Sequence, residues 1–416
     1  MPGNDASCLT AMRILLITDW NRGRGGAEAY ALWLREGLRA AGDDARLLTS
    51  SADTAADGTA DFVAFGTERV VAQTFLQITN PFAAASVRQA VHEFKPDIAC
   101  VNMFAHHLSP AIFAALGTTP VVLLASDYKC VCPIGSKLLP DGSLCTVEAG
   151  WVCCRSGCVS LPHWLRDQLR YRHIHSAIRQ VRRVVACSHW VQRELAANGI
   201  AADVILWPAP SAAPDFMRNP PPDPMFVFCG RLDLEKGVDL LLRAFVRLRT
   251  EIPSARLRIV GQGPERENLE RAARTLGIEK SVTFLGWLSP PQVDNQLREA
   301  WASVVPSLWA EPLGLVAVEA IIRGVPVIAS ASGGLGEIVE TGVTGLLFPN
   351  NNEAALTECL RAIATGSVFP THTLSPEAVK RAADTFGMVR HMREMRKVFG
   401  EVVEQRGLSP SRVVDP

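Results

Sequence analysis

Short apolar runs alternate with longer amphipathic segments along this chain, in two successive series. Apolar runs bounded by glycine or polar residues are typical of parallel strands that are buried on both faces. The first series predicts strands over residues 13–18, 45–48, 62–65, 97–101, 119–125, 184–186 and 204–206. The second series predicts strands over residues 226–229, 256–260, 282–285, 301–305, 326–329 and 345–348. Strands that alternate with helices predict an α/β fold built on parallel sheets.

The segments between these runs have the apolar spacing of helices. Helices are predicted over residues 28–38, 81–94, 161–183, 188–197, 237–248 and 312–319, after residue 264, from residue 353 and in the tail from residue 375. Residues 208–224 contain seven prolines and no apolar periodicity, which is typical of a linker. We therefore expect two doubly wound, Rossmann-like domains, residues 12–207 and 225–385, that face each other across a cleft.

The composition agrees with a globular chain of two domains. A chain of 416 residues, 48% of them hydrophobic and 20% charged, is longer than a single core normally accommodates. The formal net charge is zero, so nucleic-acid binding is not indicated. No apolar run reaches the ~20 residues that span a bilayer, and residues 1–11 do not resemble a secretory signal. We expect a cytoplasmic protein.

The segment from Ser307 to Glu319 combines two acids with the start of a helix. A buried strand ends here, Glu311-Pro312 interrupts the apolar run, and a helix that carries Glu319 follows. Proline suits the first turn of a helix, because its missing N–H would have no helical partner there. The next backbone N–H groups would then be free to bind a phosphate or another anion at the positive end of the helix. These N–H groups belong to Leu313, Gly314 and Leu315.

Two basic residues follow the first strand of the second series. Gly230-Arg231 comes directly after that strand, and Lys236-Gly237 follows after four intervening residues. Arg231 can bind phosphate oxygens with two parallel hydrogen bonds, and Lys236 adds a second positive charge. Gly230 has no side chain to exclude a ligand. We interpret the pair as a diphosphate site, although a surface salt bridge is the alternative for either residue alone.

A glycine loop follows the first strand of the chain. Gly25 and Gly26 would let backbone N–H groups approach a ligand closely, between that strand and the next helix. The loop lacks the full G-x-G-x-x-G spacing, so a plain tight turn is an equal alternative.

Polar residues follow two later strands of the first series. Ligands bind beyond the carboxyl ends of the strands in open parallel sheets, so these residues are candidates for acceptor chemistry. For either histidine alone, a structural role in a hydrogen-bonded loop is the simpler alternative. The candidates are Asn102, His106, His107, Ser126, Asp127 and Tyr128.

Six cysteines fall within a loop of about thirty residues. Zinc sites favour pairs of cysteines at short, regular spacing, but the spacing here is irregular. A redox pair or scattered free thiols are therefore the alternatives to a structural zinc site. Without a secretory signal, reduced thiols are expected. The six residues are Cys130, Cys132, Cys145, Cys153, Cys154 and Cys158.

The predicted helix over residues 161–183 is unusually rich in arginine. Its apolar positions include Trp164, Leu165 and Leu169. A basic amphipathic helix can lie on an anionic membrane surface. The alternative is the solvated basic face of an ordinary crossover helix. Peripheral contact with the inner surface of a membrane is thus one possibility that the sequence leaves open.

The second series resembles glycosyltransferase family 4, the retaining enzymes with a GT-B fold. The resemblance covers about residues 12–399 and is most specific over residues 226–348. It rests on the order and spacing of Gly230-Arg231 with Lys236-Gly237, Gly261-Gln-Gly263, Glu311-Pro-Leu-Gly314 with Glu319, and Gly333-Gly334 with Glu337.

This resemblance implies a donor site for a nucleotide-diphosphate sugar. Arg231 and Lys236 would bind the diphosphate. Glu311 would contact the hydroxyls of the donor sugar, and Glu319 those of the ribose. The N–H groups of residues 313–315 would meet the sugar or the phosphate, while Gly261 and Trp287 would line the base pocket. The last helix, about residues 386–406, would pack back on the first domain.

The reaction implied is hexosyl transfer with retention, onto a glycan or a lipid-linked acceptor in cell-surface polysaccharide or glycolipid synthesis. Glu311 and Glu319 would lie roughly 10–12 Å apart, too far for the carboxyl pair of a retaining glycosidase. A front-face displacement needs no metal and no other cofactor. Many relatives have histidine where this chain has Ser126, which puts the acceptor geometry in doubt. A sugar-nucleotide epimerase and a non-catalytic nucleotide-sugar-binding protein are the alternatives.

Overall fold

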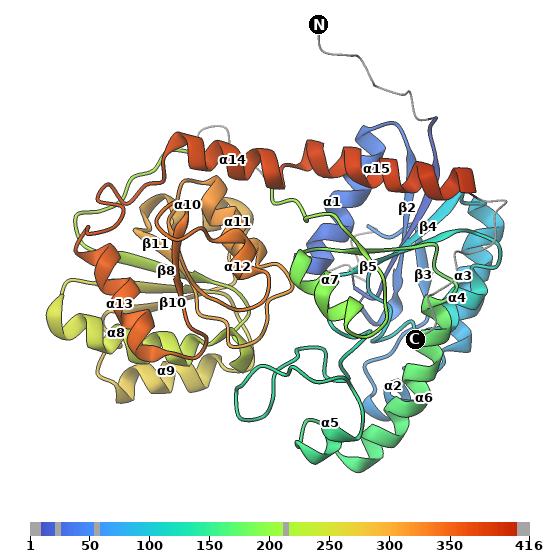
Figure 1. Cartoon of the computed structure of the whole chain (residues 1–416), viewed down its shortest axis with the longest axis horizontal. Helices are drawn as coiled ribbons and strands as arrows, with labels where there is room; N and C mark the ends of the chain where they lie inside the picture. The colour runs from blue at the N-terminus through green and yellow to red at the C-terminus, as the bar shows by residue number, and fades with distance from the viewer. Residues whose placement is uncertain (1–9, 21–25, 54–58, 211–215, 406–416) are drawn as a thin grey trace, which may run out of the picture. The chain divides into compact units, whose positions relative to one another are not determined.

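The chain forms two compact units, seen in the computed structural model of Figure 1. The structure describes residues 10–20, 26–53, 59–210 and 216–405. Unit 1 comprises residues 1–135, 147–206 and 388–416, and unit 2 comprises residues 136–146 and 207–387. Each unit contains one parallel sheet with helices, so the prediction of an α/β fold with two parallel sheets is confirmed.

Unit 1 contains a seven-stranded sheet in the order β3-β2-β1-β4-β5-β6-β7. Every neighbouring pair in this sheet is parallel. The strand order reverses its direction between β1 and β4, and this reversal opens a crevice at the carboxyl ends of the two strands. The strands are β1 (Arg13–Thr18), β2 (Asp44–Ser50), β3 (Phe62–Ala64), β4 (Ile98–Val101), β5 (Val121–Ala125), β6 (Arg183–Ala186) and β7 (Asp203–Val204).

Helices cover the sheet of unit 1. The first and last helices of the chain contact each other, and the last one also contacts β4 and β5. Right-handed crossovers place the helices that follow β3, β4 and β5 on the opposite face. The helices of this unit are α1 (Gly26–Ala40), α2 (Val70–Leu76), α3 (Pro81–Phe94), α4 (Ala111–Ala115), α5 (Trp151–Arg155), α6 (Leu161–Ile178), α7 (His189–Ala196) and α15 (Met388–Glu404), with a short 3-10 turn, η1 (Ser51–Asp53).

Unit 2 contains a six-stranded sheet in the order β10-β9-β8-β11-β12-β13, again entirely parallel. Its direction reverses between β8 and β11, as that of unit 1 does between β1 and β4. All four residues of β11 and of β12 are buried, in agreement with strands that are covered on both faces. The strands are β8 (Met225–Cys229), β9 (Arg256–Val260), β10 (Val282–Gly286), β11 (Ala302–Val305), β12 (Val327–Ser330) and β13 (Gly345–Phe348).

The helices of unit 2 follow its strands in turn, so that strand and helix alternate as the sequence predicts. They are η2 (Leu234–Lys236), α8 (Val238–Glu251), α9 (Arg266–Thr275), α10 (Pro290–Glu299), α11 (Leu315–Ile322), α12 (Leu335–Ile338), α13 (Glu353–Ala364) and α14 (Pro376–Phe386). Residues 216–224 form no helix or strand. Hydrogen bonds hold them against the rest of unit 2: Arg218 donates to the carbonyl of Arg298, and the Trp301 indole donates to that of Pro221.

Two helix boundaries differ from the sequence prediction. The helix expected from residue 312 begins at Leu315, because Gly314 adopts a φ of 98° and precedes the first helical residue. The helix expected over residues 161–183 ends at Ile178, and Arg183 already lies in β6. The prediction also missed α2, α4, α5, α10 and α12, most of which are too short to show a clear helical period.

A buried hydrogen bond joins α15 to α1 within unit 1. The Tyr30 hydroxyl lies 2.8 Å from His391 Nε2, and His391 Nδ1 lies 3.1 Å from the carbonyl oxygen of Leu206. A carbonyl can only accept, so Nδ1 carries the proton and Nε2 accepts from the tyrosine. Burial lowers the pKa of His391 to about 3, so the ring is neutral in the folded chain.

This histidine makes the stability of unit 1 depend on pH. Its pKa is about 3 in the folded chain and roughly 6.5 when unfolded, so the unfolded state binds more protons between these values. We predict that lowering the pH from 7 to 5 costs the wild type ~2 kcal/mol more unfolding free energy than the variant His391→Gln. Glutamine offers both hydrogen bonds without titrating. Urea unfolding at the two pH values measures this, and equal losses in both proteins would contradict it.

Candidate functional site

The predicted donor residues gather at the reversal point of the sheet in unit 2. Gly230 and Arg231 follow β8 directly, and Lys236 ends the short η2 turn beyond them. The segment that contains Glu311 follows β11, the neighbour of β8 in the sheet. Both loops therefore leave the carboxyl ends of the two strands between which the strand order reverses. In sheets of this kind, that crevice is where ligands bind.

The glycine that directly follows β9, Gly261, lets two backbone segments pack closely beside this crevice. A Cβ on Gly261 would lie 1.8 Å from the carbonyl oxygen of Gly230, and the φ of Gly261 is 134°. The backbones beyond β8 and β9 are thus in direct contact, and the N–H of Leu232 donates to the carbonyl of Gln262 at 2.9 Å. The glycine pattern at residues 230 and 261 positions the loop that carries Arg231 and Lys236.

A buried ion pair joins the two loops. Lys236 Nζ lies 2.7 Å from Glu311 Oε1, and the Ser307 hydroxyl donates to the same oxygen at 2.7 Å. The Lys236 ammonium also lies 4.8 Å from the centre of the Trp309 ring, within the range of a cation–π contact. Glu311 itself is only 7% exposed. The arrangement places one negative and one positive charge side by side at the base of the crevice.

These neighbours keep Glu311 ionised. Burial alone would raise the pKa of its carboxyl group. The positive charge of Lys236, with hydrogen bonds from the side chains of Lys236, Ser307 and Trp309, outweighs burial and lowers that pKa below its ordinary value. Glu311 is therefore a fixed carboxylate whose free lone pairs can accept hydrogen bonds from hydroxyl groups.

Hydrogen bonds from the end of β12 and the segment after it hold the loop before α11. The Ser330 hydroxyl donates to the carbonyl of Ser307 at 2.7 Å, and the Ser332 hydroxyl donates to that of Trp309 at 2.8 Å. The N–H of Gly334 donates to the carbonyl of Glu311 at 2.7 Å. The segment Gly333-Gly334 therefore packs against the backbone of Glu311 and holds it in place.

The start of α11 corrects one part of the predicted anion site. Pro312 was expected in the first helical turn, with the N–H groups of residues 313–315 at the helix start. The helix instead begins at Leu315, so Leu313 and Gly314 precede it and Leu313 is buried. The first helical hydrogen bond after this point runs from Ala317 to the carbonyl of Gly314. Of the three predicted N–H groups, that of Leu315 lies in the first turn.

The other donor candidates differ in their surroundings. Arg231 forms an ion pair with Asp233 and its side chain is 65% exposed. Trp287 directly follows β10 and is 61% exposed. Burial raises the pKa of Glu319 to about 7, with Arg323 opposing and Asp294 reinforcing that shift. Gly25 lies outside the described residues, whereas Gly26 begins α1.

In unit 1, a buried aspartate organises the loop that follows β4. Asp19 directly follows β1, at the reversal point of this sheet, and is fully buried. Its carboxylate accepts the backbone N–H groups of His106, His107 and Leu108 at 2.8–2.9 Å. The two histidines thus belong to a hydrogen-bonded loop. Burial lowers the pKa of His106 to about 4, an effect that Asp19 opposes.

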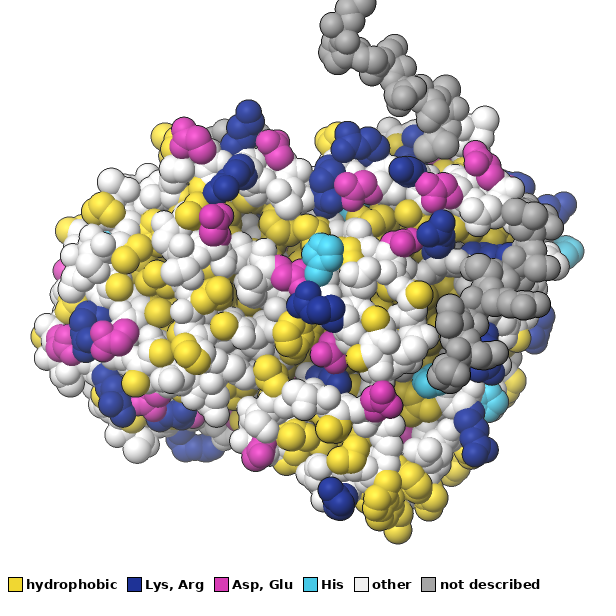
Figure 2. All heavy atoms as spheres, viewed as in Figure 1, with side chains coloured by type: hydrophobic (Ala, Val, Ile, Leu, Met, Phe, Trp, Pro, Cys, Tyr) yellow, Lys and Arg dark blue, Asp and Glu magenta, His cyan; other side chains and the backbone are white. Residues whose placement is uncertain are grey.

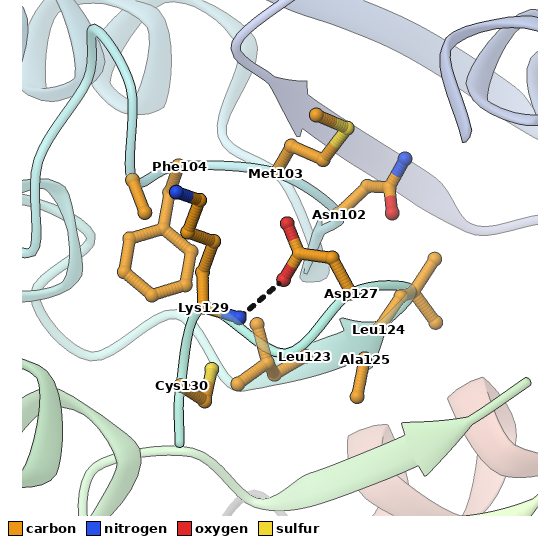
Figure 3. Close-up of a pocket in the computed structure, with 10 residues that line it drawn as sticks. Asn102, Met103, Phe104, Leu123, Leu124, Ala125, Asp127, Lys129 and Cys130 are labelled. Carbon is orange, nitrogen blue, oxygen red and sulfur yellow. Dashed lines mark hydrogen bonds between the residues drawn. The ribbon is translucent and has the colours of Figure 1, made fainter. Parts of the chain in front are cut away.

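The remaining acceptor candidates lie at the ends of β4 and β5. Figure 3 shows Asn102, Asp127 and Lys129 around one small cavity of about 10 Å³, and the N–H of Lys129 donates to Asp127 at 2.9 Å. Burial raises the pKa of the Asp127 carboxyl group. Tyr128 is buried and Ser126 is half-buried. The cavity has room for about one water molecule, so it is no sugar site in this form.

Sequence reasoning missed several residues of both sites. Ser307 and Trp309 contact the predicted acid Glu311, but nothing in their local pattern distinguishes them. Asp19 did have a usable signal, since it is an acid directly after a buried strand. Lys129 lies four residues after the end of β5, so its position gave no comparable signal.

The cysteines form no recognisable metal centre. Within the described ranges, no three or more cysteine, histidine or acidic side chains are arranged so as to hold a metal ion. Burial raises the pKa of the Cys130 thiol to about 12. Structural zinc therefore stays a prediction. Across the described part of the chain, no helix has both the length and the apolar character to cross a membrane.

Two family models match the chain in succession. The model "Glycosyl transferase 4-like domain" matches residues 25–208, and "Glycosyl transferases group 1" matches residues 214–378. Together they extend over most of both units. The chain belongs to the glycosyl transferases of group 1, as the resemblance in the sequence predicted.

Named relatives match the chain in part. The glycogen synthase of Mycobacterium tuberculosis is 37% identical over 166 residues, which are 40% of this chain and 38% of that protein. The D-inositol 3-phosphate glycosyltransferase of Streptomyces coelicolor is 37% identical over 173 residues, 39% of this chain and 36% of that protein. The chain thus spans little more than a third of the length of these relatives.

Solved structures match nearly the whole fold. Sucrose-phosphate synthase from Thermosynechococcus elongatus has a TM-score of 0.72 at 22% identity, over 94% of this chain and 99% of that one. HepE from Anabaena in complex with UDP has a TM-score of 0.67 at 20% identity, over 94% of this chain and 100% of that one. The fold is thus GT-B, with two Rossmann-like domains.

The close packing of Gly333 against Glu311 can be tested by comparing Gly333, which precedes α12, with Gly336, which lies within α12. A Cβ on Gly333 would lie 2.2 Å from the carbonyl oxygen of Glu311, at a φ of 62°. A Cβ on Gly336 would meet nothing within 4 Å. We predict that Gly333→Ala lowers the unfolding free energy by ~2 kcal/mol or more, and that Gly336→Ala changes it by less than ~1 kcal/mol. Urea unfolding measures both, and equal effects would refute this role for Gly333.

Proposed function

We propose that the chain is a retaining glycosyltransferase that moves a hexosyl group from a nucleotide-diphosphate sugar to a glycan or a lipid-linked acceptor. The observation that carries this proposal is the ionised, buried Glu311 paired with Lys236 at the reversal point of unit 2. Family membership supports it. The acceptor product would belong to cell-surface polysaccharide or glycolipid synthesis.

In this proposal, unit 2 holds the donor. Arg231 and Lys236 bind the diphosphate, and Arg231 is exposed enough to exchange Asp233 for a phosphate. Glu311 accepts hydrogen bonds from hydroxyls of the donor sugar, and Glu319 accepts from the ribose. Gly261 and Trp287 lie beside the base, while the N–H of Leu315 faces the sugar or a phosphate oxygen.

The chemical step is a front-face displacement. The bond between the anomeric carbon and the diphosphate oxygen breaks, and a bond from the acceptor hydroxyl forms on the same face. The hydroxyl proton passes to the departing phosphate oxygen. Arg231 and Lys236 would stabilise the charge that develops on this diphosphate. The carboxylate of Glu311 is held by three donors, so we assign it to orienting the sugar rather than to nucleophilic attack.

We assign the acceptor to unit 1. Asp19 and Asn102 follow β1 and β4, between which the strand order reverses, and Asp127 lies just beyond the neighbouring strand β5. The carboxylate of Asp19 accepts the backbone N–H groups of His106 and His107 and so holds their loop in place. A histidine is therefore present in this region although position 126 is serine. Tyr128 is buried beside it and would act through packing.

The donor role of the two cations is tested by substitution. We predict that Arg231→Ala and Lys236→Ala each lower kcat/KM by ~10²-fold or more, because the departing diphosphate loses a positive partner. The measurement is release of nucleoside diphosphate from UDP-glucose, GDP-mannose and related donors, with and without glycan and lipid-linked acceptors. Arg247→Ala is the matched control, since Arg247 is 63% exposed and pairs with Glu353 on the surface.

The same assay separates the alternative functions. Release that depends on the acceptor supports the transferase. Isomerisation of the donor without an acceptor would instead identify an epimerase, and binding without turnover would identify a binding protein. Wild-type rates in both the Arg231 and the Lys236 variants would reject the donor site.

We further propose that the protein works at the cytoplasmic face of a membrane, which it contacts through α5 and α6. Hydrophobic side chains gather on the surface over α5 and the start of α6 (Figure 2). Leu161, Leu165 and Leu169 recur at every fourth position of α6 and are each at least half exposed, as is Trp151 of α5.

The charges around this apolar face favour an anionic lipid surface. Within residues 151–179 the only acid is Asp167, which is buried and paired with Arg166. Arg155, Arg172 and Arg179 are exposed. A face that is apolar and basic fits anionic headgroups above acyl chains. A second copy of the same face would meet like charges.

Vesicle co-sedimentation tests this contact. We predict that the chain binds phosphatidylcholine vesicles more strongly when they contain phosphatidylglycerol. The double variant Leu165→Ser, Leu169→Ser should lower this binding about tenfold or more, because two apolar side chains no longer enter the lipid. The control is Val389→Ser on α15, since Val389 is 85% exposed in the same unit. Equal binding by both variants would refute the contact.

A further inference from the structure

The helix α6 forms one wall of a groove that the donor site does not explain. The groove has a volume of about 670 Å³, and its other walls are formed by residues 130, 131 and 133, residues 148–150, 153 and 159, and residues 197–199. This volume lies within the roughly 300–1,000 Å³ of small-molecule sites. All the lining residues belong to unit 1, so the groove is separate from the donor residues of unit 2.

Aromatic rings line this groove at helical spacing. Trp164, Gln168, Tyr171 and His175 stand on one face of α6, at intervals of three or four residues. Both Trp164 and Tyr171 are half-buried. The Tyr171 ring meets the His175 ring edge-on, with 6.1 Å between their centres. Flat apolar rings flanked by polar groups fit the C–H face of a sugar ring.

Two buried polar atoms, on residues that line the groove, have no hydrogen-bond partner among the described residues. Asp167 is 2% exposed; its Oδ1 is bound by Arg166 at 2.6 Å, but its Oδ2 has no hydrogen bond to any described residue. Trp164 Nε1 likewise has none among the described residues. One atom accepts and the other donates. Hydroxyl groups do both, so a polyol would satisfy the two atoms together.

Arginines at the edge of the groove add a site for an anion. Arg172 and Arg179 line the groove, are exposed, and form no ion pair with any acid in the described ranges. This distinguishes them from Arg166 and Arg170, which lie beside Asp167. Arg172 lies roughly 7–12 Å along the helix axis from Asp167 and Trp164. A guanidinium group binds phosphate with two parallel hydrogen bonds.

Solvation alone would account for the two arginines, but not for the rest of the groove. It leaves the buried Oδ2 of Asp167 and Nε1 of Trp164 without partners, and buried polar groups are almost always hydrogen-bonded. It also gives no reason for aromatic rings to line the groove. A ligand with hydroxyl groups at one end and a negative charge at the other accounts for all three observations.

We propose that this groove binds a sugar phosphate. The sugar hydroxyls would bind Asp167 Oδ2 and Trp164 Nε1, the ring would lie against Tyr171, and the phosphate would bind Arg172. Assigning this ligand to the acceptor rests on the proposed transferase function, whereas binding itself does not. The same chemistry occurs in a free sugar phosphate and in the headgroup of a lipid-linked one.

Indole resonances of ¹⁵N-tryptophan-labelled protein test the site, with glucose 1-phosphate as the probe. The Trp164 signal is assigned by its loss in Trp164→Phe, which removes the N–H and keeps a ring. We expect glucose 1-phosphate to shift this signal, and Arg172→Ala to weaken binding about tenfold or more. Arg172→Lys should retain part of the affinity. His173→Ala, an exposed neighbour that does not line the groove, should bind as the wild type does.

Other ligands and variants in the same binding experiment decide what is bound and at which site. Inorganic phosphate or glucose that binds as tightly as glucose 1-phosphate would overturn the combined site. Binding lost in Arg231→Ala and kept in Arg172→Ala would place the ligand at the donor site and overturn the proposal. If Arg231→Ala loses turnover but binds glucose 1-phosphate normally, both proposals hold. Dodecyl glucosyl phosphate that binds tighter than glucose 1-phosphate supports a lipid-linked ligand, and weaker binding supports a free one.

Discussion

The site in unit 2 depends on the charge of one buried carboxylate. An isolated ionised acid cannot be buried without a large loss of stability, and removal of one partner of a buried pair typically costs ~3–5 kcal/mol. Glu311 keeps its charge because Lys236 lies 2.7 Å away. The two residues come from loops that follow β8 and β11, 75 positions apart in sequence. The pair therefore fixes the two sides of the crevice relative to each other.

Each of these two loops packs against a neighbouring loop more closely than side chains would allow. Gly261 lets the backbone beyond β9 touch the carbonyl of Gly230, and Gly333 lets the segment beyond β12 reach that of Glu311. In the sequence these glycines look like positions that contact a ligand, but in the structure they contact the backbone of neighbouring loops. They let these backbones pack closely, which supports the two loops that carry Lys236 and Glu311.

The sequence predicts the sheets well because buried parallel strands are short apolar runs, visible without tertiary information. It also indicated Glu311 and Lys236, which flank strand ends. The partners Ser307 and Trp309 could not be recognised, since their role arises from packing alone. The start of α11 was predicted wrongly because the rule for Pro312 is local and does not anticipate the φ of 98° at Gly314. The groove on α6 joins segments whose proximity no pattern shows.

The two sites differ in how far the protein completes them. In unit 2 the carboxylate of Glu311 already binds Lys236 and Ser307, so the proposed donor site would be preorganised and a ligand would find its charges in place. In unit 1 the groove on α6 keeps Asp167 Oδ2 and Trp164 Nε1 without described partners. Buried polar atoms without hydrogen bonds lower the stability of the fold until a ligand binds to them. Such atoms discriminate strongly against ligands that lack the matching hydroxyl groups. Selectivity for the acceptor would then arise from these two buried polar atoms of unit 1, which have no described partner.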